Sequence, residues 1–302
     1  MRVRVLGSAA GGGFPQWNCG CPNCREGRRV DGHARPRTQE SVALSAEDKS
    51  WFLINASPEI RVQIEAFPDL WPRAERHTPI AGILLTNGDL DHCLGLLSLR
   101  ESQPLVIYAT DAVRAGFTEN NVLYRTLERF PGQVTWRRLE LGREVELGSG
   151  LFVSAVPAPG KLALHLEGQR QPSAEDNVGL VIRWPAGNHR VAYFSGVAGP
   201  SPEVERAISE ASVVFFDGTF WSSDELIAAG LGTRRAEEMA HWPIGGPEGS
   251  LRFLARVAQA KGIYIHINNT NPILLEDSPE RRALEEPEIE VAFDGMELEL
   301  DP

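Results

Sequence analysis

The sequence predicts an α/β sandwich in which two mixed β-sheets lie inside and helices cover them on the outside. Short apolar segments typical of strands recur along the whole 302-residue chain, helical patterns are few, and no repeat, linker or low-complexity segment separates them. A chain of this length can bury most of the surface that it exposes when unfolded, so one core is sufficient. We therefore expect a single domain that spans residues 1–302.

The strands are predicted where apolar and β-branched residues gather between turn signals. The run from residue 80 to residue 86 is almost continuously apolar, as expected for a strand buried on both faces. The tail, residues 289–300, alternates about Asp294-Gly295, which predicts an edge hairpin. The other expected strands are residues 3–6, 41–44, 51–54, 105–108, 151–156, 178–182, 190–194, 213–216 and 262–267.

Helices are predicted by their start signals and by apolar periodicity. Ser57 precedes Pro58, a pair that favours the start of a helix of about two turns. Apolar residues after His92 have helical spacing. Residues 160–176 are polar and irregular, and we expect them to form a loop over a functional site. Further helices are expected over residues 118–130, 202–209 and 248–260.

The charge balance excludes several classes of partner. Thirty Lys and Arg residues stand against 41 Asp and Glu residues, a formal net charge of −11, whereas a general nucleic-acid binder needs a positive surface. The same charge disfavours an anionic membrane surface. No apolar stretch approaches the roughly 18 residues of a membrane span, and the apolar part of the N-terminus is too short for a secretory signal. We therefore expect a cytoplasmic protein.

Three of the four cysteines, Cys19, Cys21 and Cys24, lie within six residues as C-x-C-x₂-C. In a reducing compartment this spacing indicates metal binding rather than a disulfide. The intervening Gly and Pro turn the chain, so that three thiolates can share a tetrahedral Zn²⁺ with a fourth ligand from elsewhere. Such a closed site would be structural. The alternative is three buried thiols without a metal.

A second candidate site follows the apolar strand at residues 80–86. Asn87-x-Asp89-x-Asp91-His92 places up to four potential metal ligands where a strand ends, which is where α/β folds carry their chemistry. Alternatively, Asp89 or Asp91 only caps the following helix, a common role of Asp. Cys93, which opens an apolar helical segment, is expected to be a core thiol.

Two more strand ends carry residues suited to chemistry. Asp217 ends one apolar strand, His266 ends another, and His241 lies between them in the sequence. A lone histidine at a strand end is more often a core residue, but several such strand ends in one sandwich favour a shared pocket. The other four histidines lie in polar loops or turns and are expected on the surface: His33, His77, His165 and His189.

The order of these motifs resembles the metallo-β-lactamase fold. The strand–N-x-D-x-D-H–helix unit stands where that fold carries H-x-H-x-D-H. The segments FPQWNCGCPNC, LDHCLGLL and HINNTNP together resemble the pyrroloquinoline quinone (PQQ) biosynthesis protein B family. Phosphodiesterase relatives with the same cysteine cluster are the second match. The resemblance covers nearly the whole chain and implies a metallo-β-lactamase-like αββα sandwich.

The resemblance implies one active-site metal rather than two. In two-metal hydrolases of this fold, histidines and a bridging Asp bind the first metal at positions that here hold Asn87, Asp89, Lys161 and Gly196. A Lys ammonium there would repel a cation. Asp89 is retained only as a further candidate ligand. The ligands of the other metal are present as Asp91, His92 and His266.

Two imidazoles and one carboxylate with open positions are the ligand set of non-haem Fe(II) oxygenases. The family resemblance agrees, since it implies an iron-dependent hydroxylase acting with O₂ on the tyrosine ring of a peptide-derived Glu–Tyr precursor of PQQ. It gives His241 an acid/base role beside the metal. Asp217 would either orient a ligand imidazole or ligate directly. Asn269 stands at the position of the fourth zinc ligand of the phosphodiesterase relatives, and either it ligates weakly or another residue takes its place.

The expected cofactors are therefore a structural Zn²⁺ and an active-site Fe²⁺, and the expected partners are the precursor, O₂ and other PQQ biosynthesis proteins. Two other functions stay open. A phosphodiester or ester hydrolase would use one metal-bound water, but the missing histidines count against it. A carrier would bind PQQ or its precursor and take part in its transport toward the periplasm.

Overall fold

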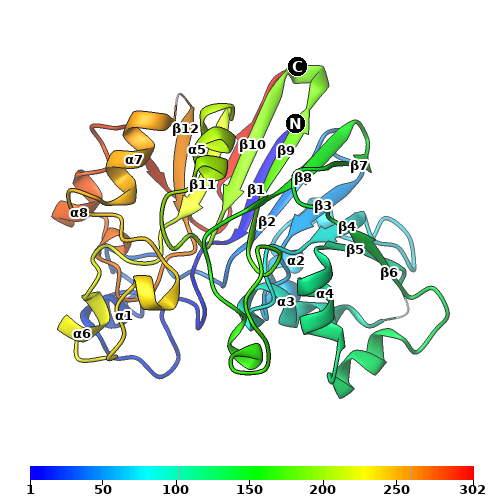
Figure 1. The fold of residues 1–302 in the computed structure, drawn as a ribbon, viewed down its shortest axis with the longest axis horizontal. Coiled ribbons are helices and arrows are strands. Elements are labelled where there is room, and N and C mark those ends of the chain that lie inside the picture. Colours follow the sequence, from blue (N-terminus) through cyan, green and yellow to red (C-terminus); the bar gives the residue numbers. More distant parts are fainter. Residues whose placement is uncertain (102, 259) are drawn as a thin grey trace.

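The computed structural model describes residues 1–101, 103–258 and 260–302, and it has the expected sandwich of two seven-stranded mixed sheets (Figure 1). Across the first sheet lie β14 (Glu297–Glu299), β1 (Arg2–Gly7), β2 (Ser41–Ser45), β3 (Trp51–Ile54), β4 (Ile80–Leu84), β5 (Leu105–Ala109) and β6 (Val134–Arg138). Across the second lie β13 (Glu290–Val291), β12 (Lys261–Ile265), β11 (Val213–Asp217), β10 (His189–Phe194), β9 (Val178–Trp184), β8 (Leu151–Pro157) and β7 (Glu144–Gly148).

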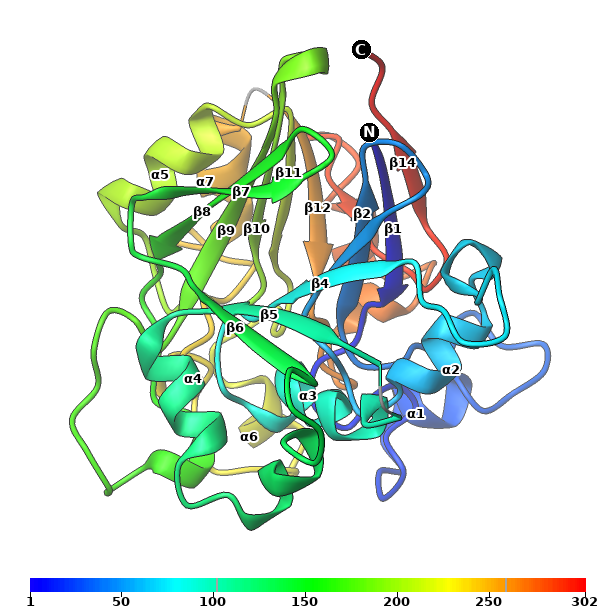
Figure 2. The same cartoon turned by 90° about the vertical axis from the view of Figure 1, so that its right-hand side faces the viewer.

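Short helices cover the outer faces of the sheets, as Figure 2 shows for α5 and α7 beside the second sheet. No helix among the described residues is long and apolar enough to cross a bilayer. The helices are α1 (Pro22–Glu26), α2 (Ile60–Glu65), α3 (Leu90–Cys93), α4 (Asp111–Thr118), α5 (Pro202–Ser209), α6 (Glu225–Ala228), α7 (Ser250–Val257) and α8 (Pro279–Arg282).

Three apolar clusters join these layers. Neighbouring side chains of a strand point to opposite faces of its sheet, so one strand serves two clusters. Phe215 of β11 packs between the sheets, together with Phe52 of β3. Phe216, the next residue, packs under α7 against Leu254. Ile60 of α2 belongs to the third cluster, on the outer face of the first sheet. The alternation of buried residues therefore fixes which side of each strand faces the other sheet.

Strand direction determines where polar loops meet. β3, β4, β5 and β6 run parallel, as do β10, β11, β12 and β13. The carboxyl ends of β4, β11 and β12 lie at the lower end of the sandwich in Figure 1, and both termini lie at the upper end. Polar residues that follow these strands are therefore gathered at one edge, where parallel sheets place their sites.

The helix predicted over residues 118–130 is wrong. α4 ends at Thr118, and Val122–Leu127 forms a separate 3₁₀ turn. Thr110 caps α4 by accepting a hydrogen bond from the Val113 amide, a start signal that the sequence analysis missed. Asn120 has φ of 58°, and a residue in this left-handed region cannot continue a right-handed helix.

The predicted C-terminal hairpin is also wrong. β13 pairs with β12 in the second sheet and β14 pairs with β1 in the first, so the tail passes from one sheet to the other. The prediction missed the mostly exposed strands β6 and β7, because they lack an apolar signal. The helix expected over residues 248–260 is α7, which is shorter, and residue 259 lies outside the described residues.

Gly95 holds α3 against the turn after β3, so we expect Gly95→Ala to destabilise the protein. The Gly95 amide donates to the Ala56 carbonyl at 2.9 Å, and an added Cβ would lie 2.1 Å from the Ser57 carbonyl oxygen. Overpacking of this kind costs about 1–3 kcal/mol, which guanidinium unfolding measures. Gly199→Ala is the matched control, since its Cβ would meet no atom within 4 Å. Equal unfolding midpoints for the two variants would contradict this expectation.

Candidate metal centres

Asp91, His92 and His266 form a compact group that joins the two sheets, which we call the Asp–His–His cluster. Asp91 and His92 lie in α3, shortly after β4 of the first sheet, whereas His266 directly follows β12 of the second. One ligand atom from each residue lies within 4.8 Å of the others. The Asp91 Oδ2 is 3.2 Å from Nε2 of His266 and 3.6 Å from Nε2 of His92. The structure thus brings together the three residues expected to bind the active-site metal.

A buried hydrogen-bond chain lies behind His92. Thr86 Oγ1 donates to Asn55 Oδ1 at 3.1 Å and lies 3.0 Å from Nδ1 of His92. The side-chain nitrogen of Asn55 lies 2.9 Å from the same Nδ1 and donates to both oxygens of Glu40. Glu40 is only 1% exposed and accepts a further bond from the Tyr193 hydroxyl. Nδ1 of His92 is thus occupied, and Nε2 is left to face Asp91.

Thr219 holds His266 in the same way. Its hydroxyl donates to Asp217 Oδ1 at 2.6 Å and lies 2.8 Å from Nδ1 of His266, which therefore donates to it. Hydrogen bonds of this kind fix the tautomer of a metal-binding histidine and aim its other nitrogen at the metal. Both histidines of the cluster therefore present Nε2 to one point beside Asp91.

Asp217 is fully buried and already accepts hydrogen bonds on both oxygens. Oδ2 accepts from Nδ1 of His241 at 2.8 Å and from the Val197 amide at 2.8 Å, and Oδ1 accepts from Thr219. Burial alone would raise the pKa of Asp217, but His241 and the hydrogen bond from Thr219 lower it overall. Asp217, His241 and His266 also lie close enough together to hold a metal, but these contacts favour an orienting role for Asp217 over direct ligation. Because Nδ1 of His241 is occupied, Nε2 is the nitrogen left for the cavity that His241 lines.

The charges of the Asp–His–His cluster are strongly coupled. Burial alone would raise the pKa of Asp91, but His92 and the hydrogen bond to His266 outweigh it and hold this pKa well below its usual range. Burial alone would lower the pKa of His266, but Asp91 outweighs it and raises this pKa to about 9. A metal ion in the cluster would therefore have to displace a proton from His266.

Amides and an ion pair fill the positions beside the cluster. Asn87 Nδ2 donates to Asn177 Oδ1 at 3.3 Å, and Asn177 donates to the Gly196 carbonyl at 2.8 Å. Asp89 Oδ2 lies 3.8 Å from the Lys161 ammonium. Asp89 stands at the N-cap position of α3 without a capping hydrogen bond and belongs to none of the ligand clusters of the described residues. The donor set thus fits one metal ion at the Asp–His–His cluster.

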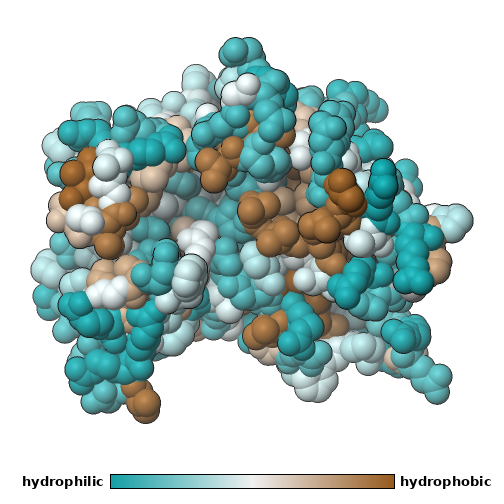
Figure 3. Space-filling model, turned by 90° about the horizontal axis from the view of Figure 1, so that it is seen from below, coloured by the Kyte–Doolittle hydropathy of each residue, from teal (hydrophilic) through white to brown (hydrophobic). Residues whose placement is uncertain are grey.

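A cavity of about 510 Å³ opens above this cluster. Figure 3 shows a hollow on this face, with apolar side chains gathered on one side of it. As expected, part of the loop at residues 160–176 forms one wall, through Gly160, Lys161, Leu164 and His165. His165 is exposed as expected but also lines the cavity, so it is more than a surface residue. His33 and His77 are partly or fully exposed, and His189 is partly exposed.

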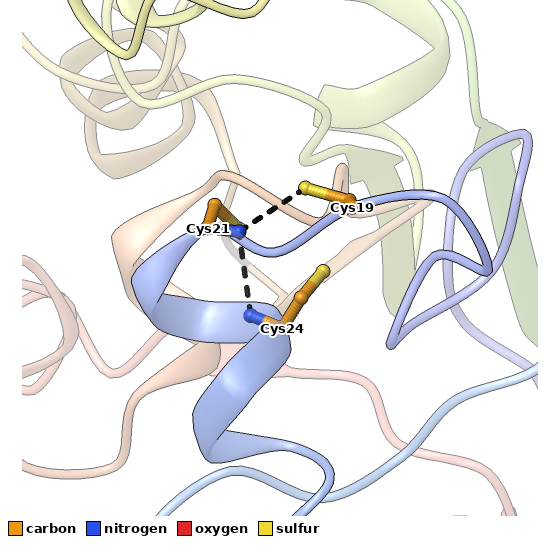
Figure 4. Close-up of side chains that lie close together, drawn as sticks. All are labelled: Cys19, Cys21 and Cys24. Carbon is orange, nitrogen blue, oxygen red and sulfur yellow. Dashed lines mark hydrogen bonds between the residues drawn. The ribbon is translucent and has the colours of Figure 1, made fainter.

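Cys19, Cys21 and Cys24 form a second group, the cysteine cluster, whose sulfurs lie within 4.8 Å of one another. Figure 4 shows Cys19 on the loop before α1 and Cys24 on its first turn. Cys21 Sγ accepts a hydrogen bond from the Cys24 amide at 3.4 Å, and Cys19 Sγ accepts one from the Cys21 amide at 3.4 Å. Such bonds support thiolates, although burial raises the pKa of Cys24 to about 11. Cys93 is apart from this group and buried in the core.

Asn269 lies over the three sulfurs. Its side-chain nitrogen is 3.2 Å from Sγ of Cys19 and 3.3 Å from Sγ of Cys24. The nitrogen and oxygen of an amide are exchanged by a simple flip, so the same side chain can turn Oδ1 to a cation held by the thiolates. Because Asn269 follows His266 by three residues, the cysteine cluster also anchors the loop that carries His266.

Comparison with known proteins agrees with this fold. The profile of the beta-lactamase superfamily domain matches residues 50–267, so the chain belongs to the beta-lactamase superfamily. Coenzyme PQQ synthesis protein B of Methylorubrum extorquens is 43% identical over 99% of this chain and 100% of the relative. That of Methylococcus capsulatus is 42% identical over the same shares. Within the superfamily, the chain belongs to the coenzyme PQQ synthesis protein B family, whose name places it in the synthesis of the coenzyme PQQ.

Solved structures give the same result. The crystal structure of Zn²⁺-bound PqqB from Methylobacterium extorquens matches with a TM-score of 0.93 and 42% identity, over 99% of this chain and 100% of that one. A diphosphatase of the PhnP family matches with a TM-score of 0.68 and 20% identity, over 99% and 98% of the two chains. At that identity the second match shows a shared fold only.

The sequence analysis missed the residues that position the histidines. Thr86 directly precedes the Asn87-x-Asp89-x-Asp91-His92 motif, and Thr219 follows Asp217 by two residues. Their positions near these strand ends could have marked them as part of the site. Asn55, which follows β3 with φ of 60°, has its side-chain nitrogen 2.9 Å from Nδ1 of His92. Glu40 gave no signal, because nothing in its local sequence shows that tertiary packing buries it.

We expect Cys21→Ser to remove zinc from the cysteine cluster and to destabilise the fold. Zinc affinity at a closed thiolate site contributes directly to folding stability. The variant should lack the chelator-resistant zinc found by metal analysis of the purified wild type, and its Tm should fall by more than about 5 °C. Cys93→Ala is the control, since Cys93 lies outside the cluster, and it should keep the zinc. A chelator-resistant zinc in Cys21→Ser would refute this site.

We expect metal binding at the Asp–His–His cluster to release about one proton at pH 7, because His266 has a pKa of about 9. Affinity should therefore fall as pH decreases below 9 and become insensitive to pH above it. Titration calorimetry with Zn²⁺ in two buffers of different ionisation enthalpy measures the release, using protein whose chelator-resistant site is already filled. Binding heats that do not depend on the buffer at pH 7 would show that metal binding releases no proton from His266.

Proposed function

We propose that this protein catalyses an iron- and O₂-dependent hydroxylation of a tyrosine ring, in a peptide-derived Glu–Tyr precursor, during PQQ synthesis. One observation carries the proposal: two imidazoles and one carboxylate converge beside an open cavity, while Lys161, Asn87 and Asn177 occupy the space next to them. This is the donor set of mononuclear Fe(II) oxygenases.

A two-metal hydrolase is disfavoured because it needs a second full set of ligands for a metal about 3.5–4 Å away. Among the described residues, the other group of carboxylate and imidazole with ligand spacing is Asp217 with His241 and His266. It shares His266 with the Asp–His–His cluster, and both oxygens of its carboxylate already accept hydrogen bonds. One metal is therefore the better fit.

The residues of the site would have separate roles in this reaction. Asp91, His92 and His266 would hold Fe²⁺, which supplies the one-electron steps that O₂ requires. His241, oriented by Asp217, would take the phenolic proton of the substrate. The ring C–H becomes C–OH and the second oxygen atom leaves as water. An external reductant supplies the two electrons, and the solvent supplies the two protons that this requires. The loop at residues 160–176 would limit the access of bulk water to the cavity.

The cysteine cluster supports a separate, structural role for zinc. Cys19, Cys21 and Cys24 would hold Zn²⁺ with Asn269 as the fourth group, and a Zn²⁺-bound relative is known from its crystal structure. A closed site of this kind has no open position for a substrate. Zinc would then fix the loop after β12, and the other proteins of PQQ synthesis would supply and take up the small molecules.

The test uses protein purified without oxygen, supplied with Fe²⁺, and given a tyrosine-containing precursor, O₂ and ascorbate as reductant. We expect one chelator-resistant zinc, one exchangeable iron and substrate-dependent O₂ uptake. His92→Ala and His266→Ala should lose the iron and at least about 100-fold of the uptake rate, a typical effect of a lost metal ligand or its support. His77→Ala is the matched control, since His77 is exposed, and it should behave as the wild type.

Other outcomes would replace the proposal. Two exchangeable zinc ions without O₂ uptake would indicate a hydrolase. A tight zinc without any second metal, together with binding of PQQ or its precursor, would indicate a carrier. Iron retained by both histidine variants would show that the ligand assignment is wrong.

A further inference from the structure

The two walls of the cavity each carry one cationic side chain. Lys161 lies on the loop after β8, and Arg234 lies on the segment that follows α6. Two carboxylates, those of Asp89 and Asp91, also line the cavity and balance the charges of the two cations. A divalent ion bound at the Asp–His–His cluster would therefore give the cavity a net positive charge. The chain as a whole has a net charge of −11. The cavity is therefore a local exception that would attract anions.

Lys161 has a loose ion pair, and Arg234 has none among the described residues. The Lys161 ammonium is 3.8 Å from Asp89 Oδ2, beyond hydrogen-bond distance, and Asp89 Oδ1 accepts instead from the Leu164 amide at 3.1 Å. Arg234 donates to the backbone carbonyl of Glu238, and in the described ranges no carboxylate lies within 4.0 Å of its guanidinium. By contrast, Arg170 on the same loop as Lys161 is paired with a carboxylate, that of Asp176.

Several apolar side chains line the same cavity. Leu90 and Leu164 line the cavity on the side of the first sheet and the loop at residues 160–176, and Phe220 and Met239 line it beside Arg234. Leu90 and Leu164 are 58% and 68% exposed, although a ligand in the cavity would cover them. A ligand that matches these walls has a flat apolar body and carries negative groups at its ends.

We infer that Lys161 and Arg234 each bind a carboxylate of the proposed Glu–Tyr precursor and so hold its ring over the Asp–His–His cluster. The inference rests on the proposed function and adds the residues that select the substrate. An ammonium has three N–H donors, so Lys161 can bind a carboxylate while it stays beside Asp89. A guanidinium can bind a carboxylate through two parallel hydrogen bonds, and Arg234 uses one donor on the Glu238 carbonyl.

The test measures binding without turnover, on protein whose Asp–His–His cluster is filled with Zn²⁺. L-Glutamyl-L-tyrosine, which has two carboxylates, and L-tyrosinamide, which has none, are titrated by calorimetry at low and high salt. We expect the dipeptide to bind and Lys161→Met and Arg234→Met each to weaken it about tenfold or more, the usual effect of losing a charge-assisted hydrogen bond. Arg234→Lys should restore part of the loss, and salt should weaken binding in the wild type.

Arg235→Met is the matched control, because Arg235 is the exposed neighbour of Arg234 and does not line the cavity. It should bind the dipeptide as the wild type does, and thermal unfolding checks that each variant is folded. In turnover, Lys161→Met and Arg234→Met should raise KM more than they lower kcat.

The inference is overturned if the wild type does not bind the dipeptide at millimolar concentration, if it binds tyrosinamide equally well, or if the two Met variants bind as the wild type does. Loss of binding in Arg235→Met as well would point to a general charge effect and would also overturn it. Because zinc supports no O₂ chemistry, a failure of the oxygenase proposal would leave these binding results unchanged. The two proposals can therefore fail separately.

Discussion

The contact on which the site depends is the one between the Asp91 carboxylate and the imidazole of His266. These residues are 175 positions apart in the sequence, and they follow strands of different sheets. They meet because the carboxyl ends of β4 and β12 reach the same edge of the sandwich. The backbone bridge between Asn87 and Asn177 and that between Ala9 and Ile267 join segments close to this edge. The packing of the sheets thus determines whether a metal centre exists at all.

Holding these groups in place has a conformational cost that the surrounding structure must offset. His266, Asn55 and Ala240 have φ values of 59°, 60° and 65°, in a region that non-glycine residues rarely adopt. All three lie at the cluster or beside a residue that faces it. Hydrogen bonds from Thr219 and Thr86 and the anchoring of the loop at Asn269 oppose relaxation of this backbone. Backbone strain of this kind is often found at functional sites.

The same fold supports other chemistry when the neighbouring positions change. The Asn87–Asn177 amide pair and the Lys161–Asp89 ion pair lie beside the Asp–His–His cluster, and the cavity opens above it. The charge of that space differs from the charge of the whole molecule. The side chains that line the cavity therefore decide which small molecules can enter. The shared architecture does not decide this, because one fold can support many functions.

Features that depend on local spacing could be predicted from the sequence. The C-x-C-x₂-C turn brings three sulfurs together within six residues, and the Asp91-His92 pair follows a buried strand, so both could be predicted without knowledge of the rest of the chain. Which distant groups meet depends on the folded structure. It turned Asp89 toward Leu164, occupied both oxygens of Asp217 with hydrogen bonds and buried Glu40 behind His92. It also placed β13 and β14 in different sheets. Local patterns specify periodicity and turns, whereas the pairing of strands and the packing of sheets depend on contacts between residues far apart in the chain.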